Sequence, residues 1–283
     1  MNASAAPPPG ARRRARSLML TSALAITVAA VLVPFHWLVV GATHSSQEIF
    51  GSPPPLLPGG HLAENLHSLQ ESAQFGRVLL NSLLLSALYT VGAGAVCTLA
   101  GYGFAVFRFR GRNALFGLVM LGLVVPVQAT LVPLFRMMAD LHWLGTYQAV
   151  VLPNLALPFG IFLMRQSMGA LPPALLDSGR MDGCGELRLF LRVALPAMRP
   201  ALAALAVFLF LYQWNDFVWP LVVLRDGSSY TIPVALASLQ GLDETDHGAI
   251  LAGTAVAALP MALVFLALQR HFVSGLLAGA VKE

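Results

Sequence analysis

The chain has 283 residues, of which 57% are hydrophobic and 11% are charged, and its mean hydropathy is +0.73. Soluble domains carry about 25% charged residues, so this chain has too few charges to cover a water-facing surface, and a soluble protein is excluded. The net charge of +4 does not indicate a nucleic-acid partner, because the arginines lie between apolar intervals and form no single basic patch with interleaved aromatic residues. We therefore expect a protein of the lipid bilayer.

The residue types that carry chemistry are few and scattered. The two cysteines, Cys97 and Cys184, fall in different predicted segments and suggest neither a disulfide framework nor a metal site. The histidines form no HExxH pattern, and no GxSxG motif is present. We predict no catalytic residue and no metal ligand, and an intramembrane enzyme is an alternative without a supporting motif.

Six apolar intervals of about 20 residues or more are each long enough to cross a hydrocarbon core of roughly 30 Å. They are Leu18 to Val40, Val78 to Phe107, Ala114 to Met138, Gly145 to Met164, Ala201 to Leu224, and Ala249 to Gln269. The first, residues 18–40, is longer than the apolar region of a signal peptide, so we expect it to stay uncleaved.

The polar segments complete the predicted organisation. Residues 1–17 form a basic tail that we expect to be disordered, and residues 41–76 form an external loop whose second half is a candidate surface helix. Residues 77–283 hold the other five spans and the polar segment 166–200. With both termini in the cytoplasm, fourteen of the 17 lysines and arginines lie inside, and only Arg77, Arg136 and Arg225 lie near the outer face. We therefore expect a multi-pass protein of a bacterial-type cytoplasmic membrane with segment 166–200 inside.

Prolines and glycines in the spans indicate bent, closely packed helices. Proline frees a backbone carbonyl that a neighbouring helix or water must satisfy, and small residues let helix backbones approach closely. We predict that prolines interrupt four spans, namely the third at Pro126 and Pro133, the fourth at Pro153 and Pro158, the fifth at Pro220 and the sixth at Pro260. The second span carries Gly92, Gly94, Gly101 and Gly103. Ordinary helix packing explains part of this pattern, and a conduit with bending helices explains the rest.

Polar side chains inside the spans are candidates for a solute pathway. Gln128 lies in the third span, Asn154 in the fourth, and Trp214-Asn215-Asp216 in the outer third of the fifth. An aromatic face beside hydrogen-bonding groups suits a hydroxylated solute such as a sugar. A carboxylate within a span is a functional hypothesis by default, although Asp216 could equally be structural and hydrated near the outer interface.

The interval Leu171 to Pro200 combines charges of both signs with apolar residues at helical spacing on both sides of Asp182-Gly183. Asp182 is a good helix N-cap and Gly183 allows a sharp turn, so we predict a helix, a turn and a second helix with prolines at both ends. Two such short helices cannot bury a core of their own. Their apolar face must therefore dock on something.

This interval closely resembles the cytoplasmic Glu-Ala-Ala…Gly loop of the permease subunits of binding-protein-dependent ABC importers, specifically the MalG-like carbohydrate type. The matching residues are Pro172-Pro173, Asp177-Ser178-Gly179, Asp182-Gly183-Cys184, Phe190, Leu195-Pro196 and Pro200. The resemblance continues through Asn81-Ser82, Gly101 to Ala105, Trp214 to Phe217 with Pro220-Leu221, Gln269-Arg270, Gly275-Leu276 and Gly279 to Lys282. One departure is that Asp177-Ser178-Gly179 replaces Glu-Ala-Ala, and another is that the tryptophan common before the sixth span is absent.

The resemblance implies an all-α membrane protein with six transmembrane helices, the type I importer permease fold and a cytoplasmic coupling helix. It implies that Asp177, Ser178, Gly179, Asp182, Gly183, Phe190 and Pro196 couple the chain to an ATPase. The implied partners are a second, homologous permease subunit, two ATP-binding-cassette ATPase subunits and an extracytoplasmic sugar-binding protein. The sequence has no GxxxxGK[ST] loop, so we expect no cofactor here and ATP to be bound by the ATPase.

Three alternatives stay open at this stage. The same family could carry a non-sugar solute, such as a polyol or a glycerophosphodiester. An ion-coupled secondary transporter is less well supported, because no midplane carboxylates and no internal repeats are visible. A membrane scaffold without transport is the third alternative.

Overall fold

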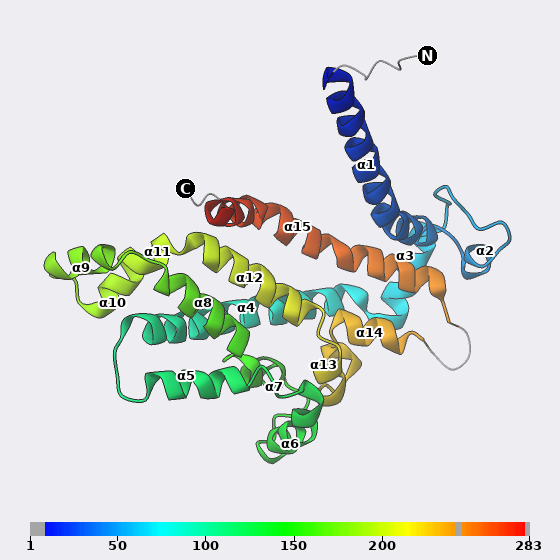
Figure 1. Cartoon of the computed structure of the whole chain (residues 1–283). Coiled ribbons are helices and arrows are strands. Elements are labelled where there is room, and N and C mark those ends of the chain that lie inside the picture. Colours follow the sequence, from blue (N-terminus) through cyan, green and yellow to red (C-terminus); the bar gives the residue numbers. More distant parts are fainter. Residues whose placement is uncertain (1–8, 241–244, 281–283) are drawn as a thin grey trace, which may run out of the picture. The chain divides into compact units, whose positions relative to one another are not determined.

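A computed structural model describes residues 9–240 and 245–280, and these residues are mainly helical and contain no β-strand (Figure 1). They group into two compact units, one made of residues up to 69 with 245–255, and the other of residues 70–244 with those from 256 onward. The larger unit holds every candidate site residue predicted above. Each unit is described by itself.

The elements follow one another as short and long helices. They are α1 Pro9–Gly41, α2 Ser46–Ile49, α3 Leu62–Ala73, α4 Phe75–Val106, α5 Arg112–Leu121, α6 Val127–Asp140, α7 Tyr147–Val151, the 3-10 turn η1 Leu152–Asn154, α8 Pro158–Gly169, α9 Pro173–Met181, α10 Glu186–Leu189, the π-turn η2 Phe190–Ala194, α11 Leu195–Ala197, α12 Arg199–Trp214, α13 Val218–Val223, the 3-10 turn η3 Gly227–Ser229, α14 Ile232–Ser238 and α15 His247–Ala280. The surface helix predicted for the second half of residues 41–76 is present as α3.

Three described helical stretches are long and apolar enough to cross a membrane: Ser17–Gly41, Phe75–Val106 and His247–Ala267. Two bent pairs pass the same test when each is taken together, namely Tyr147–Asn154 with Pro158–Gly169 at 45°, and Glu186–Ala197 with Arg199–Trp214 at 82°. The predicted third span, Ala114 to Met138, consists of the two helices α5 and α6, separated around Gly122 to Pro126. The apolar intervals are therefore helical, but fewer of them are continuous than the sequence predicts.

One boundary prediction was wrong. The tail was expected to be disordered to residue 17, yet α1 already begins at Pro9. Proline is well tolerated at the first helical position, and the alanines and arginines that follow are good helix formers. Residues 1–8 lie outside the described part of the chain.

The prolines break helices at some of the predicted places. Pro158 begins α8, Pro126 stands before α6, and Pro220 is the third residue of α13. A proline at 220 cannot donate to the carbonyl of residue 216 and collides with it, so the fifth span ends at Trp214 and restarts at Val218. Pro133 and Pro260 were also predicted to interrupt spans, but each lies inside an unbroken helix.

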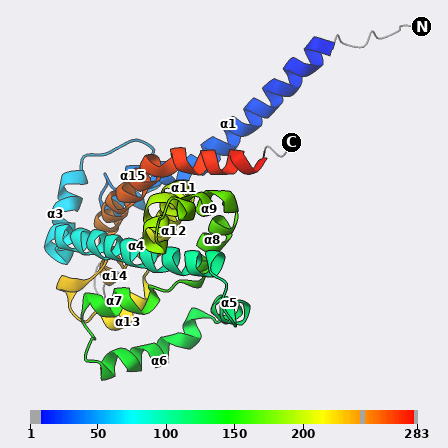
Figure 2. The same cartoon turned by 90° about the vertical axis from the view of Figure 1, so that its left-hand side faces the viewer.

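The larger unit is built around α4, which packs against α8 and α12 (Figures 1 and 2). The buried face of α4 has helical spacing, and its members are Val78, Ser82, Leu85, Tyr89, Ala93, Cys97, Gly101 and Phe104. A methyl group on Gly101 would lie 2.5 Å from Met164 Cβ, and one on Gly160 would lie 2.7 Å from Cys97 Sγ. The predicted close helix contact is confirmed at Gly101, whereas Gly160 was not among the predicted glycines and Gly103, which was, has no neighbour within 4 Å.

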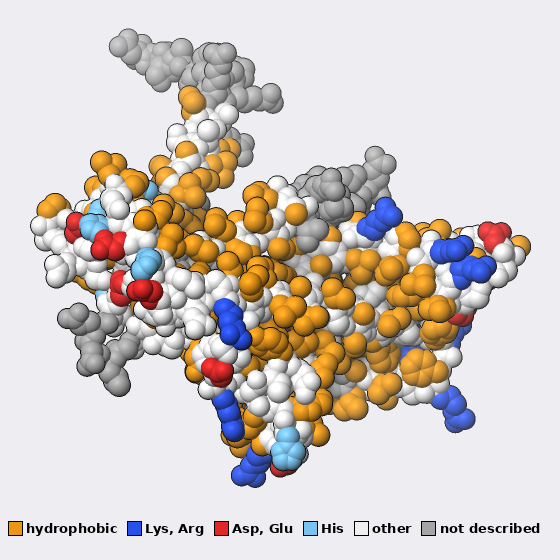
Figure 3. Space-filling model, turned by 180° about the vertical axis from the view of Figure 1, so that it is seen from behind, with side chains coloured by type: hydrophobic (Ala, Val, Ile, Leu, Met, Phe, Trp, Pro, Cys, Tyr) orange, Lys and Arg blue, Asp and Glu red, His pale blue; other side chains and the backbone are white. Residues whose placement is uncertain are grey.

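The opposite face of α4 carries large apolar side chains that nothing in the unit covers. Leu80, Leu84, Leu88, Val91 and Leu99 are 48–73% exposed and lie three, four or eight residues apart. Hydrophobic side chains also dominate the visible face of the space-filling view (Figure 3). Such a surface is stable in lipid or against another apolar subunit and not in water.

The smaller unit is held together by buried polar contacts. The Asn65 side-chain amide on α3 donates to the carbonyls of Ala42 (2.8 Å) and His44 (2.9 Å), which follow the end of α1. The Asp246 carboxylate accepts from Ser68 Oγ at 2.7 Å and from the backbone N–H of Ala249 at 2.9 Å. These bonds fix the chain around the first turn of α15, in the region where the family's tryptophan is missing.

Candidate functional site

The segment predicted as helix, turn and helix has that arrangement, with α9 and α10 joined by the turn at residues 182–185. The N–H of Gly183 donates to the Arg180 carbonyl, and the N–H of Cys184 donates to the Gly179 carbonyl, both at 3.0 Å. This pair of bonds is a Schellman motif, which needs a left-handed residue after the helix, and Gly183 has φ +80°. The predicted role of Gly183 as the turn residue is confirmed.

The predicted role of Asp182 was wrong. We expected it to cap the N-terminus of the second helix, but it is the C-cap residue of α9, and Gly185 is the N-cap of α10. The reason is that Asp182 ends α9 and the Schellman turn occupies residues 183 and 184, so the second helix starts three residues later than the sequence pattern indicates. The Asp182 side chain is exposed at the tip of the segment.

The apolar residues of the segment divide into an inner and an outer set. Leu176, Gly179, Leu189, Phe190 and Ala194 are buried within the unit. In contrast, Met181, Leu187 and Leu191 are 89%, 69% and 50% exposed. One apolar face of the segment therefore packs against its own unit, and a second apolar face is exposed. This arrangement is expected of a docking element.

A chain of polar contacts ties the segment to the end of α4. The Tyr102 hydroxyl donates to Glu186 Oε2 at 3.2 Å. Arg180 Nε donates to Glu186 Oε1 at 2.9 Å, and Arg180 Nη1 donates to Asp177 Oδ1 at 3.2 Å. The hydrogen bond from Arg180 holds the pKa of Glu186 below its ordinary value. These contacts connect α9 and α10 to the long helix α4.

Phe190 has an attachment role and does not face outward. Its ring lies 5.0 Å from the Tyr102 ring, and its side chain is 7% exposed. Asp177, Ser178 and Pro196 are exposed, and the Ser178 hydroxyl donates to the carbonyl of Leu175 at 3.0 Å. The predicted coupling residues are therefore brought into one segment, but they perform different local tasks.

The structure gives a physical reason for glycine in the Asp-Ser-Gly variant. A methyl group on Gly179 would lie 2.5 Å from Leu189 Cδ1 and 3.6 Å from Val193 Cγ2. Leu189 has no exposed surface and so has little room to move away. Gly179 and Leu189 therefore form a matched pair, in which the larger residue occupies the space that an alanine at 179 would need.

A second candidate site is a pocket of about 90 Å³ beside the break between α12 and α13. Its lining residues are Val127, Thr130, Leu131, Leu134, Asn154, Tyr212, Asp216, Val218 and Trp219. Two of the predicted pathway residues, Asn154 and Asp216, are brought together here from different spans.

The other three predicted pathway residues do not line this pocket. Trp214 is buried and its ring stacks on Phe210, with 5.3 Å between centroids. The Asn215 amide donates to the carbonyl of Leu211 at 2.8 Å and ends α12, while Gln128 is exposed on α6. The aromatic groups at the pocket are Tyr212 and Trp219, so the tryptophan after the break takes the place expected of the one before it.

Two backbone carbonyls in the fourth span lack a donor within their own helix, because the residue four positions later is a proline. Pro153 cannot donate to the Ala149 carbonyl, which instead accepts from Trp219 Nε1 at 2.9 Å. Pro158 cannot donate to the Asn154 carbonyl, which accepts from the Tyr89 hydroxyl at 3.1 Å. The expectation that neighbouring helices satisfy such carbonyls is confirmed.

Several residues of both sites were missed in the sequence. Arg180 lies three residues after Asp177, a spacing from which an ion pair could have been predicted. No local pattern indicates that Tyr102, 84 residues away, contacts Glu186. The positions of the prolines indicate which carbonyls lack a donor within their own helix, but they do not reveal that Tyr89 and Trp219 supply the donors.

Residues 69–277 match the family model of the inner membrane component of binding-protein-dependent transport systems. The chain belongs to this family, and it is a membrane permease subunit of an ATP-binding-cassette transporter. The all-α fold is the type I importer permease fold. It is similar to a solved bacterial ABC transporter involved in the import of the acidic polysaccharide alginate, with a TM-score of 0.82 and 19% identity over 94% of this chain and all of that chain.

Among characterised relatives, the chain is 35% identical to the lactose transport system permease protein LacG of Rhizobium radiobacter, over 96% of this chain and 98% of the relative. It is 40% identical to the arabinooligosaccharides transport system permease protein AraQ of Bacillus subtilis, over 71% and 72%. It is also 34% identical to the sn-glycerol-3-phosphate transport system permease protein UgpE of Pectobacterium atrosepticum, over 93% and 97%. These relatives are permeases for carbohydrates or for a phosphorylated polyol.

Proposed function

We propose that this chain forms half of the translocation pathway of a carbohydrate importer and is driven through the α9–α10 segment by a separate ATPase. The observation that carries the proposal is the outward apolar set, Met181, Leu187 and Leu191, on a segment whose inner face is anchored to α4. Exposed apolar side chains at the tip of a small rigid element fit a cleft on a partner.

The anchoring contacts determine how such docking would produce movement. A push on α9 or α10 passes through Tyr102, Glu186 and Phe190 into α4, the helix on which α8 and α12 pack. Because close packing makes this unit stiff, the helices would move together and change access to the pathway. ATP is bound and hydrolysed by the partner subunits in this proposal, and the chain itself is not an enzyme.

The pocket beside the α12–α13 break favours a neutral, hydroxylated solute. Its lining offers a carboxyl group, an amide, a phenol and an indole, and it includes neither lysine nor arginine. A phosphate ester would meet the Asp216 carboxyl group without a compensating cation. We therefore place lactose-like or oligosaccharide substrates before sn-glycerol-3-phosphate, which remains the second candidate because of the UgpE relatives.

The volume of the pocket sets a condition on the mechanism. About 90 Å³ is well below the roughly 300–1,000 Å³ of usual ligand pockets, so the solute would enter only when α6 or α13 moves. Such opening is expected of a pathway that is accessible from alternate sides.

The proposed assembly contains this chain, a second homologous permease, two ATPase subunits and an extracytoplasmic solute-binding protein. A relative fold has been solved with an alginate-pentasaccharide-bound periplasmic protein, at 19% identity and a TM-score of 0.67. The arginine distribution supports a cytoplasmic position for both termini and for the α9–α10 segment.

Substitution of the outward apolar set tests the coupling role. Met181→Asp and Leu187→Asp are expected to abolish co-purification with the ATPase and ATP-driven uptake, while the chain stays in the membrane. Leu57→Asp is the matched control, because Leu57 is 76% exposed but lies in the predicted external loop. Normal co-purification of both test variants would refute the proposal.

A further inference from the structure

The turn between α4 and α5 concentrates positive charge at the end of a membrane-length helix. Arg108, Arg110 and Arg112 occur within five residues, directly after the helix that ends at Val106. No acidic residue occurs between Phe107 and Leu121. Within the described residues, none of the three arginines forms an ion pair with a carboxylate.

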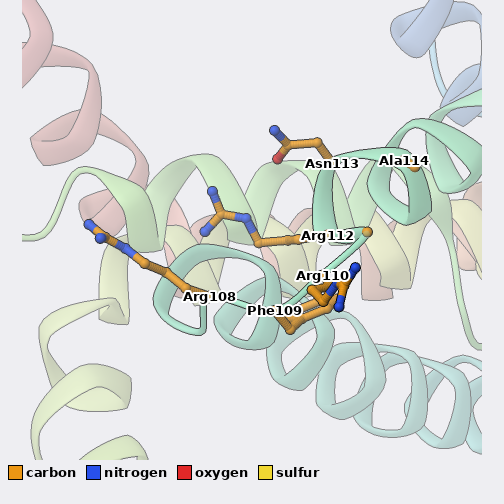
Figure 4. Close-up of a pocket in the computed structure, with 7 residues that line it drawn as sticks. Arg108, Phe109, Arg110, Arg112, Asn113 and Ala114 are labelled. Atoms are coloured by element: carbon orange, nitrogen blue, oxygen red, sulfur yellow. The ribbon is translucent and has the colours of Figure 1, made fainter.

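The turn lines a shallow pocket of about 530 Å³ that is open to the surroundings, formed by Arg108, Phe109, Arg110, Gly111, Arg112, Asn113 and Ala114 (Figure 4). Figure 4 shows the side chains of Arg108 and Arg112 extending to the same side of the turn, while Arg110 extends to the other. Arg112 Nη1 donates to the Phe107 carbonyl at 3.2 Å, which holds this guanidinium over the turn. Two cations thus flank one side of the pocket and a third stands on its other side.

The backbone at the pocket adds further donors. Gly111 has φ +81° and is the N-cap of α5, and no side chain caps this helix. The N–H of Arg112 already donates to the Phe109 carbonyl at 3.3 Å, so the N–H groups of Asn113 and Ala114, which no side chain caps, are the ones that favour an anion beside the arginines. Arg165 of α8, which packs against α5, does not line the pocket and lies 3.8 Å above the Phe116 ring, and α8 brings no acidic residue to α5.

An apolar surface begins where the pocket ends. Leu115, Leu118 and Leu121 are spaced three residues apart along α5 and are 48%, 64% and 60% exposed. Phe107 and Phe109 at the turn are 40% and 45% exposed and extend this apolar surface. A ligand that fits both surfaces has an anionic head and apolar chains.

We propose that the turn at residues 108–113 binds the phosphate group of an anionic phospholipid, with the acyl chains lying along the leucines of α5. Guanidinium groups match phosphate oxygens in a bidentate manner, and basic pockets at the ends of membrane helices select anionic lipid head groups. This binding goes beyond the transport function and does not depend on which solute is carried.

The test measures lipid affinity of the purified full-length chain with its partner subunits in detergent, by native mass spectrometry. The probes are phosphatidylglycerol, phosphatidylcholine with the same acyl chains, and inorganic phosphate. We expect a preference for phosphatidylglycerol, which weakens roughly five-fold for each arginine removed. Arg108→Gln and Arg112→Gln are the test variants, and Arg225→Gln, an exposed arginine outside the α9–α10 segment, is the control, which should bind as the unsubstituted chain does.

Each outcome is decisive. Loss of affinity in the two test variants but not in the control would support the proposal. Equal affinity in all variants would overturn it and leave the arginines a purely topological role. Competition by inorganic phosphate at the affinity of the lipid would also overturn it, because the leucine surface would then contribute nothing. Loss of ATPase co-purification without a change in lipid affinity would overturn it in favour of a protein interface.

Discussion

Replacement of Gly183 by valine tests the geometry of the α9–α10 turn. Gly183 has φ +80°, and a side chain at this position would meet nothing within 4 Å, so the effect is conformational and not steric. A non-glycine residue in the left-handed region costs about 1–2 kcal/mol, and a β-branched one more. If the turn opens instead, the two Schellman bonds are lost at about 1 kcal/mol each. The native turn should therefore become at least about five-fold less populated.

ATP-driven uptake in proteoliposomes is the assay, with the amount of chain in the membrane measured alongside. Gly183→Val should lower uptake several-fold at equal amounts of protein, and Gly183→Asn should lower it less, because asparagine tolerates the left-handed region. Gly185→Val is the matched control, since Gly185 has φ −65° and is equally open. The reasoning would be refuted by normal uptake in Gly183→Val, or by equal losses in Gly183→Val and Gly185→Val.

Three further predictions concern packing, buried hydrogen bonds and pH. Gly179→Ala restores the alanine typical of the family, yet it should lower the temperature of unfolding in detergent. Overpacking against Leu189 costs about 1–3 kcal/mol, whereas the gain in helix propensity is only about 1 kcal/mol. Adding Leu189→Val should recover the loss, and a more stable single variant would contradict the packing argument. Trp219→Phe should destabilise the chain by about 1–3 kcal/mol by leaving the Ala149 carbonyl unpaired. Trp143→Phe is the control and should cost less, because the Trp143 indole has no hydrogen bond among the described residues. Equal losses of stability would show that the hydrogen bond to the Ala149 carbonyl does not contribute. Because Arg180 lowers the pKa of Glu186, the contribution of this ion pair is complete above the ordinary value of 4.5 and is lost as the pH falls through the lowered pKa. Glu186→Gln should therefore flatten the acid limb of the stability profile, and an unchanged limb would show that the pair does not contribute.

The prolines illustrate the boundary between what sequence predicts and what it leaves open. Their spacing correctly predicts helix breaks at Pro126, Pro158 and Pro220, since a proline always removes a donor and clashes with the carbonyl four residues earlier. The same rule applied to Pro133 and Pro260 gave breaks that do not exist. Whether a helix ends or continues at a proline depends on which groups satisfy the freed carbonyl, and these come from other parts of the chain.

The coupling segment divides in the same way. The presence of two short helices around Gly183, and the need for their apolar face to dock, could be predicted because turn chemistry and helical spacing are local properties. The capping role of Asp182 was misjudged because Asp182 ends α9 and the Schellman turn at residues 183 and 184 moves the N-cap of the second helix to Gly185. The division of the apolar residues into an attached and an outward set depends on the position of α4, which no local pattern contains.

The sequence by itself determined the membrane setting, the helical class and the family resemblance, because each of these depends on composition or on residues close together in the chain. Only the tertiary structure decided that Tyr102 meets Glu186, that Gly179 makes room for Leu189, and that Asp216 and Asn154 share a pocket while Trp214 and Gln128 lie elsewhere. These pairs are far apart along the chain or lie on helix faces whose orientation is set by packing. The packing of the helices in the folded unit therefore decides which of these residues are brought together.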